Sequence, residues 1–250
     1  MIEAAMNAVI FDLDGTLVDS EPLSDVAWRR VLAVHGHYVS DAGVRAAHGL
    51  RFDDAYAWFA RDARLPPRDF IWSDYSQLLF ASFDNGLVAF SDAVRTARRL
   101  QVDGVALALA TSSQRERLDR TLAAVGLHEL FTVTVAGDEV SCGKPAPDGY
   151  LAAARLLGVD PTCCVAIEDS QAGIEAARAA RMTVLAVSRP GRAGPLTGAD
   201  LLTGEVSTAG VTALLTGTAR AVATPDRARD SAGSPPRRHA AKSGSDRRPR

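Results

Sequence analysis

The chain has 250 residues, of which 47% are hydrophobic and 23% charged, with 28 basic and 30 acidic side chains. This is the composition of a globular protein, and the length allows one large domain or two small ones. No apolar run reaches about 18 residues and the N-terminal sequence lacks a signal-peptide pattern, so we expect neither a membrane span nor export.

The cysteines favour a reducing environment. Cys142, Cys163 and Cys164 are odd in number, and the last two are neighbours in the chain, which seldom bridge each other. The sequence also contains no Cys/His cluster at zinc spacing. We therefore expect free thiols and a cytoplasmic protein.

The C-terminal segment 218–250 differs from the rest of the chain. It carries nine basic and three acidic side chains, four prolines and few large apolar residues. Such a segment buries too little surface to offset its ordering entropy, so we predict a disordered basic tail. Its charge could attract nucleic acid, but the lack of interleaved aromatic residues favours a solvated extension.

Before this tail, short apolar runs alternate with longer segments of helical period. This alternation predicts an α/β fold with a Rossmann-like parallel sheet and helices on both faces. The predicted strands are 8–12, 105–110, 131–136, 164–167 and 184–187, and the predicted helices between them include 91–100, 113–125, 148–157 and 171–180.

The alternation stops between residues 21 and 86. This segment has no convincing strand and predicts successive helices at 23–34, 41–47, 53–63 and 68–80. We therefore predict a catalytic core formed by 1–20 and 87–217, with a helical cap at 21–86 above the carboxyl edge of the sheet. The active site should lie beneath this cap.

The first predicted strand ends in two carboxylates, Asp12 and Asp14, followed by Gly15. Open α/β sheets bind ligands at the carboxyl ends of their strands, and residues two apart in an extended chain point the same way. Carboxylates this close repel each other unless a divalent cation is bound or one is protonated. The alternative is a turn that ends the strand, with Gly15 at a positive φ.

A second acidic pair, Glu168 and Asp169, follows the predicted strand 164–167 in the same way. Two strand ends that both carry carboxylates favour a site over a simple turn. The oxygens of Asp12, Glu168 and Asp169, with the backbone carbonyl group of Asp14, suit Mg²⁺, which takes its remaining ligands from water and substrate phosphate. We therefore predict a magnesium site.

Two further segments supply the complement of this acidic site. Thr111, Ser112 and Ser113 follow the strand at 105–110 and predict a phosphate cradle at a helix N-terminus, although Ser112 or Ser113 could simply cap that helix. Lys144 stands between Gly143 and Pro145 and is the only lysine before the tail. In a chain that otherwise uses arginine, this compact ammonium on a rigid loop favours a functional role over an exposed surface position.

Together these residues resemble the four ordered motifs of the haloacid dehalogenase superfamily. The motifs are Asp12-x-Asp14-Gly-Thr, Thr111, Gly143-Lys144-Pro145 and Glu168-Asp169. The similarity covers residues 6 to about 190, and each motif stands at a predicted strand end. The helical insert after the first motif resembles the subfamily with an α-helical cap, which includes phosphoglycolate phosphatase, sugar-phosphate phosphatases and β-phosphoglucomutase.

The resemblance implies a Mg²⁺-dependent phosphatase of small phosphorylated metabolites such as sugar phosphates. Asp12 would attack phosphorus and form an aspartyl phosphate, while Asp14 would protonate the leaving alkoxide and then deprotonate water. Lys144 and Thr111 would neutralise the oxygens of the transferred group. Metal-free dehalogenases lack a carboxylate at the place of Asp14, and phosphonatases need a cap lysine, so both fit poorly.

Two alternatives stay open beside this interpretation. A β-phosphoglucomutase would usually carry a cap lysine, which is missing, and a histidine near the place of Ser24. A non-catalytic phosphate-binding module would ordinarily have lost a nucleophile or a metal ligand, and all of these are present. The sequence does not decide between a monomer and a dimer.

The segment His48-Gly-Leu-Arg51 resembles cap residues of sugar-phosphate enzymes. Arg51 could hold a phosphate or a sugar hydroxyl in such a cap. It could equally form a surface ion pair with Asp53 or Asp54. We give these two interpretations equal weight.

Overall fold

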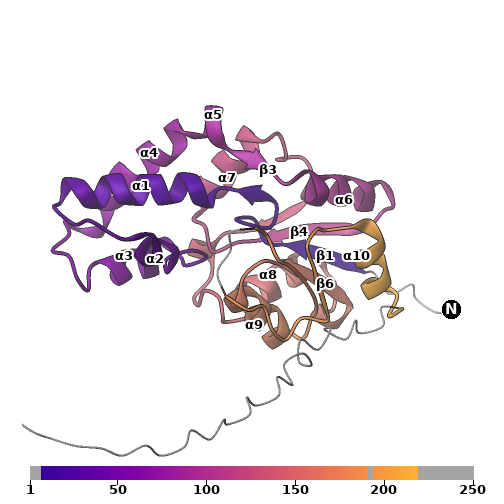
Figure 1. The fold of residues 1–250 in the computed structure, drawn as a ribbon. Helices are drawn as coiled ribbons and strands as arrows, with labels where there is room; N and C mark the ends of the chain where they lie inside the picture. Colours follow the sequence, from indigo (N-terminus) through magenta and orange to yellow (C-terminus); the bar gives the residue numbers. More distant parts are fainter. Residues whose placement is uncertain (1–6, 191–193, 219–250) are drawn as a thin grey trace, which may run out of the picture.

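The computed structural model describes residues 7–190 and 194–218, and the sheet at its centre confirms the predicted α/β fold. Six parallel strands stand in the order β5-β4-β1-β6-β7-β8 (Figure 1). The predicted tail lies almost wholly in 219–250, outside the described residues. The strand bounds are β1 Ala8–Phe11, β4 Ala106–Ala110, β5 Val133–Val135, β6 Cys164–Glu168, β7 Thr183–Val187 and β8 Leu201–Thr203.

The central strand β1 shows how apolar runs make this sheet. Its four side chains are fully buried and alternate between the two faces, with Val9 and Phe11 in one core and Ala8 and Ile10 in the other. A strand that is apolar on both sides requires helices on both faces, and these are present. One face is covered by α6 (Ser91–Val102), α7 (Arg115–Ala124) and α10 (Thr208–Leu215), and the other by α8 (Asp148–Leu157) and α9 (Gln171–Ala179).

Several short elements were not predicted. β8 and α10 extend the sheet and its cover beyond the last predicted strand, and 3₁₀ helices occupy Gly137–Glu139 and Pro161–Cys163. A two-stranded antiparallel sheet joins β2 (Val18–Asp19) to β3 (Val88–Ala89). Two-residue strands are too short for hydrophobic alternation to indicate them. This small sheet ties together the two connections that lead into and out of the helical insertion.

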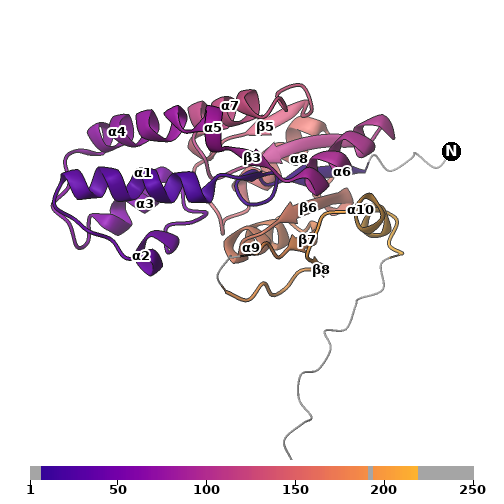
Figure 2. The ribbon, with the colours of Figure 1, turned by 45° about the horizontal axis from the view of Figure 1, so that its top comes forward.

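The insertion between β2 and β3, here called the cap, is helical throughout its regular structure. Its helices gather beyond one edge of the sheet (Figures 1 and 2). Their buried faces form a separate hydrophobic core around Trp28, which stacks on Phe52 at 5.4 Å and lies 4.6 Å from the ring of Tyr75. The helices are α1 Glu21–Val34, α2 Asp41–Arg45, α3 Phe52–Phe59, α4 Arg68–Ala81 and α5 Phe83–Gly86.

None of the helices in the described part of the chain combines the length and apolar character needed to cross a bilayer.

Candidate active site

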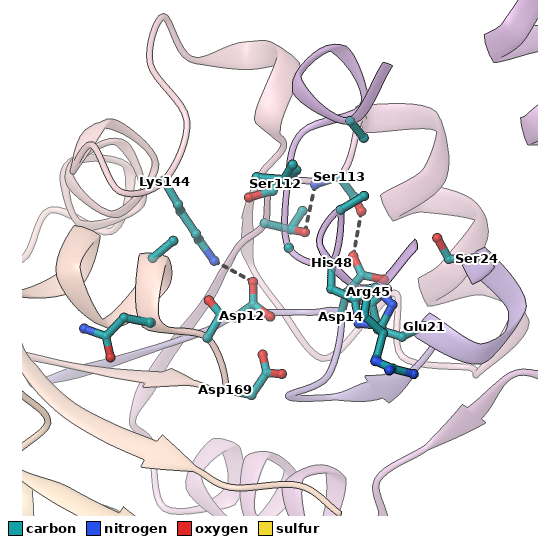
Figure 3. A pocket seen from close by; sticks show the side chains of 18 of the residues that line it. Asp12, Asp14, Glu21, Ser24, Arg45, His48, Ser112, Ser113, Lys144 and Asp169 are labelled. Atoms are coloured by element: carbon teal, nitrogen blue, oxygen red, sulfur yellow. Dashed lines mark hydrogen bonds and ion pairs between the residues drawn. The ribbon is translucent and has the colours of Figure 1, made fainter. Parts of the chain in front are cut away.

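The sheet order brings the predicted residues to one edge. β1 lies between β4 and β6, and the backbone amide of Asp12 still bonds the carbonyl oxygen of Ile167 after β1 has ended. The carboxyl ends of these three neighbouring strands therefore place Thr111, Asp12 and Asp169 side by side. Figure 3 shows Asp12, Asp14, Lys144 and Asp169 facing a common space.

This space is a cavity of about 590 Å³ between the core and the cap. The core supplies its charged floor, and the cap supplies a wall of aromatic and polar side chains. Ser112, Ser113, Gln171 and the segment 194–197 complete the core side. The cap wall includes Glu21, Ser24, Trp28, Arg45, His48, Phe52, Trp72 and Tyr75.

Lys144 reaches the floor from the loop that follows β5. Its Nζ donates to Oδ1 of Asp12 at 2.5 Å and also to Oε1 of Glu168. Burial acts to lower the pKa of Lys144, but the two carboxylates raise it above its ordinary value. The side chain is therefore a fixed ammonium next to Asp12, as a group that neutralises phosphoryl oxygens has to be.

Asp12, Glu168 and Asp169 form a buried acidic cluster whose potential ligand oxygens lie within 4.8 Å of one another. Burial raises the pKa of Asp12 well above its ordinary value, and the charges of Glu168 and Asp169 raise it further against the effect of Lys144. Three carboxylates against one ammonium leave excess negative charge. Hard oxygen donors with this charge fit a divalent cation such as Mg²⁺.

Glu168 has most of its hydrogen-bonding capacity occupied by protein groups. Besides Lys144, it accepts from the hydroxyl of Tyr150 at 2.7 Å and from the hydroxyl and backbone amide of Ser170. The side chain is fully buried, and its carboxyl group lies directly over Gly173 of α9. Within the cluster, Glu168 therefore holds Lys144 in place, while Asp12 and Asp169 line the cavity.

The carboxylate of Asp14 is held by groups other than those of the acidic cluster. Its Oδ2 accepts from the Ser113 hydroxyl at 2.6 Å, and its Oδ1 accepts from Ser20 and, at 2.8 Å, from Nη2 of Arg117. Burial alone would raise the pKa of Asp14, but Arg117 and the two hydroxyls lower it below its ordinary value. Protein groups thus hold both oxygens of this carboxylate, and the backbone carbonyl group of Asp14 stays the predicted metal ligand at this position.

The predicted start of the helix after β4 is wrong. α7 begins at Arg115, not at residue 113, and its N-cap is Gln114. Neither Ser112 nor Ser113 caps it; the side chain of Asp138 accepts from the amide of Arg115 instead. Asp138 belongs to a distant segment, so local sequence gave no sign of this cap.

The residues 111–114 therefore form a turn at the cavity floor. The Thr111 hydroxyl accepts from the Ser113 amide at 3.1 Å, and Ser113 holds Asp14. Thr111 and Ser112 both line the cavity.

Arg51 forms the ion pair of one of its two interpretations, and a role in substrate binding stays a prediction. Its Nε pairs with Asp54 at 3.0 Å, and a bond to the carbonyl oxygen of Ser141 reaches the core. The side chain packs so closely on Gly143 that a Cβ atom there would lie 2.6 Å from Cδ of Arg51. The charged cap residue that does line the cavity on α2 is Arg45.

Sequence reasoning missed several polar residues of this site, namely Arg117, Tyr150, Glu21 and Arg45. Arginine is the usual cation of this chain, so its residue type carries no signal. Tyr150 stands among alanines and leucines of a helix and reads as packing. Arg117 lies in the first turn of the helix that follows β4, and this position could have placed it near the site. Its partners Asp14 and Tyr75, however, are brought to it only by the tertiary fold.

Comparison with known proteins agrees with this geometry. The family model of haloacid dehalogenase-like hydrolases matches residues 6–181, and the chain belongs to this family. It is 33% identical over 195 residues to fructose-1-phosphate phosphatase YqaB of Escherichia coli, covering 72% of this chain and 95% of that one. The crystal structure of CbbY from Rhodobacter sphaeroides with phosphate has a TM-score of 0.75 at 28% identity, covering 83% and 99% of the two chains.

A plant relative is longer than this chain. The bifunctional riboflavin kinase/FMN phosphatase of Arabidopsis thaliana is 34% identical over 197 residues, which is 78% of this chain and 52% of the relative. The matched region thus spans about half of the length of the plant relative. Taken with the site and the family, these relatives show a phosphoric monoester hydrolase of the haloacid dehalogenase type.

Proposed function

We propose that the protein is a Mg²⁺-dependent phosphatase of small phosphorylated sugars that works through an aspartyl phosphate on Asp12. The observation that carries this proposal is the position of Asp12, between the Lys144 ammonium and Asp169 at the floor of the cavity. A carboxylate in that position can attack a phosphoryl group whose oxygens meet positive charge.

Asp12, Asp169 and the backbone carbonyl group of Asp14 would hold the Mg²⁺, with Glu168 completing the acidic cluster. The ion would supply positive charge for the phosphoryl oxygens that Lys144 and the Thr111 hydroxyl do not reach. Lys144 comes from the loop after β5 and Thr111 from the end of β4, so they can contact different oxygens of one phosphoryl group.

In the first step, an oxygen of Asp12 attacks phosphorus and the bond to the leaving oxygen breaks. The electron pair of that bond goes to the leaving oxygen, which takes a proton from Asp14. In the second step, water attacks the phosphoryl group, gives its proton to Asp14, and Asp12 leaves as a carboxylate. The contact with Arg117 favours the charged form of Asp14 that the second step needs.

The cap wall fits a polar leaving group rich in hydroxyls. Trp28 and Trp72 offer apolar ring surface, while Glu21, Arg45 and His48 offer hydrogen-bonding groups. The relative named for fructose 1-phosphate supports a sugar phosphate as substrate class. Arg51 lies outside this wall and contributes through its contact with the loop of Lys144.

The phosphomutase alternative is not favoured. The cap carries no lysine, and Ser24, which stands near the place of the mutase histidine, bonds the hydroxyl of Tyr75 at 2.9 Å. Two of the relatives compared above have phosphatase in their names. A cytoplasmic location stays a prediction, in keeping with the three free cysteines.

The direct experiment measures inorganic phosphate released from fructose 1-phosphate with Mg²⁺ and after its chelation. We expect release by the wild type, loss on chelation, and a fall of at least about a thousandfold in Asp12→Asn, which retains size but not nucleophilicity. Cys142→Ser, an exposed change outside the cavity floor, is the control. Equal release by Asp12→Asn and the wild type would refute the proposal.

A further inference from the structure

Arg117 bridges the core, the cap and Asp14. It belongs to the first turn of α7, a core helix whose Leu118 and Leu122 pack against the sheet. Its Nη2 donates to Asp14 at 2.8 Å and to the Ser20 hydroxyl at 3.3 Å, whereas its Nη1 donates to the Tyr75 hydroxyl of the cap at 2.9 Å. One rigid, planar guanidinium therefore sets the distance between a cap helix and the acid/base carboxyl group.

Each end of this bridge is fixed in its own body. Tyr75 is buried on α4, stacks against Trp28 and shares its hydroxyl with Ser24 of α1, so it moves with the cap. At the other end, α7 is held to the core because Arg115 pairs with Glu139 at 2.6 Å. A shift of α4 relative to α7 must therefore stretch a contact of Arg117.

The guanidinium is oriented by this bridge alone. Its Nε is buried and lacks a hydrogen-bond partner among the described residues, so its orientation depends on Nη1 and Nη2. The side chain is only 13% exposed and lies in the cavity wall next to the leaving-group side. A buried cation in this position keeps its geometry only while Asp14 and Tyr75 are both in place.

We propose that Arg117 is a positioning residue that ties Asp14 to the cap, so that the carboxyl group is aimed at the leaving oxygen only while α4 is seated on α7. This inference rests on the proposed function. Arg117 touches neither substrate nor phosphoryl group in this role. Arg117 acts through its contact with Asp14, and its contact with the Tyr75 hydroxyl makes its own position depend on the position of the cap.

The test compares two substrates that differ in their need for a proton. The leaving group of fructose 1-phosphate is a sugar alkoxide, which needs the Asp14 proton. The leaving group of p-nitrophenyl phosphate is a stable phenolate, which does not. The ratio kcat/KM covers the steps from free enzyme and substrate up to the departure of the leaving group. For both substrates it therefore reports the first phosphoryl transfer.

We expect Arg117→Met to lower kcat/KM for fructose 1-phosphate by about tenfold or more, and that for p-nitrophenyl phosphate by less than about threefold. Tyr75→Phe keeps the ring packing and removes only the hydroxyl. It should therefore also lower kcat/KM more for fructose 1-phosphate than for p-nitrophenyl phosphate, but by a smaller factor than Arg117→Met. In the double variant, Tyr75→Phe should add nothing to Arg117→Met, because both break one connection.

Arg120→Met is the matched control. Arg120 is also on α7 and also reaches α4, where its guanidinium lies over the ring of Phe80 at 5.6 Å. Its loss should leave both kcat/KM values unchanged. If Arg117→Met does not fold, judged by circular dichroism, Tyr75→Phe alone carries the comparison.

Equal losses on the two substrates, no loss on either, or additive effects in the double variant would each overturn the positioning role. A wild type that hydrolyses neither substrate would instead overturn the proposed function. The two failures are therefore distinguishable.

Discussion

The buried side chain of Glu168 fits only because residue 173 is a glycine and has no side chain of its own. The Cα atom of Gly173 lies so close that a Cβ atom there would be 1.9 Å from the Glu168 carboxyl carbon. Glu168 in turn holds Lys144 and accepts from Tyr150. The glycine in the first turn of α9 therefore makes room for the carboxylate that fixes the Lys144 ammonium.

Gly173→Ala should displace Glu168 and with it Lys144. We expect a loss of about 2 kcal/mol in the free energy of unfolding, because the added methyl group overpacks a fully buried site, together with a fall in kcat of about tenfold or more. Urea denaturation and steady-state kinetics measure these effects.

Gly149→Ala is the matched control for this change. Gly149 lies in the first turn of α8, and a Cβ atom added there meets nothing within 4 Å. Its replacement should leave kcat unchanged and stability equal or slightly higher, since alanine favours helix. Gly173→Ala behaving like Gly149→Ala would contradict the role of the glycine.

At the scale of elements, one buried ion pair joins four segments around the site. Asp92 in the first turn of α6 accepts from Nη1 of Arg189 at 2.8 Å and from the amide of Val206 at 2.7 Å. Arg189 follows β7 and also donates to the carbonyl oxygen of Thr16, in the turn just after Asp14. The pair thus anchors the turn that follows Asp12 and Asp14.

This pair predicts how stability depends on pH. Burial acts to raise the pKa of Asp92, but the bonds from Arg189 and Val206 outweigh it, and the pKa lies below its ordinary value. A depressed pKa in the folded state gives stability that is present above the unfolded value of about 3.9 and is lost as pH falls through the folded pKa.

Asp92→Asn should therefore lower the free energy of unfolding by about 3 kcal/mol near neutral pH, because it leaves the buried Arg189 charge unpaired. The difference from the wild type should shrink as the pH falls below about 4. Denaturation curves across this pH range measure both effects.

The control for the ion pair is on the same helix. Arg99 of α6 pairs at 2.9 Å with Asp103, the C-cap residue of this helix, but their side chains are 63% and 38% exposed. Asp103→Asn should change stability by no more than about 0.5 kcal/mol at any of these pH values. If Asp92→Asn differs from the wild type by the same amount at every pH, the assignment of this pH dependence to Asp92 is wrong.

At the scale of the whole molecule, the acidic cluster at the carboxyl edge of the sheet would link the binding of a metal ion to folding. Asp12, Glu168 and Asp169 converge only in the folded chain, so an ion held there stabilises the native state alone. Mg²⁺ at about a hundredfold excess over its dissociation constant should add about 3 kcal/mol to the free energy of unfolding.

Thermal unfolding with and without Mg²⁺ measures this stabilisation. Asp169→Asn should remove the rise in Tm, whereas Asp119→Asn, an exposed change on α7, should preserve it. The same rise in Asp169→Asn and in the wild type would place the ion elsewhere.

The features that could be predicted from the sequence are those set by residues close together in the chain. The strands of the core are continuous apolar runs, and β1, β4 and β6 end where polar residues begin, so Asp12, Thr111 and Asp169 could be placed from sequence alone. The neighbouring positions of those strands in the sheet then bring the residues together.

The parts that could not be predicted depend on long-range partners. Arg117 matters because Asp14 and Tyr75, which lie 103 and 42 residues earlier in the chain, meet at its guanidinium. The start of α7 depends on Asp138, and Arg51 meets the backbone of Ser141 instead of the cavity. Residue type and spacing carry no information on such contacts.

The most direct test of the central claim is to locate the phosphoryl group during turnover. The enzyme is mixed with Mg²⁺ and fructose 1-phosphate, quenched in acid within one turnover, and digested for peptide mass spectrometry. We expect one phosphoryl group on the peptide that contains Asp12, and none in Asp12→Asn. A phosphoryl group on a different residue, or equal labelling of Asp12→Asn, would contradict it.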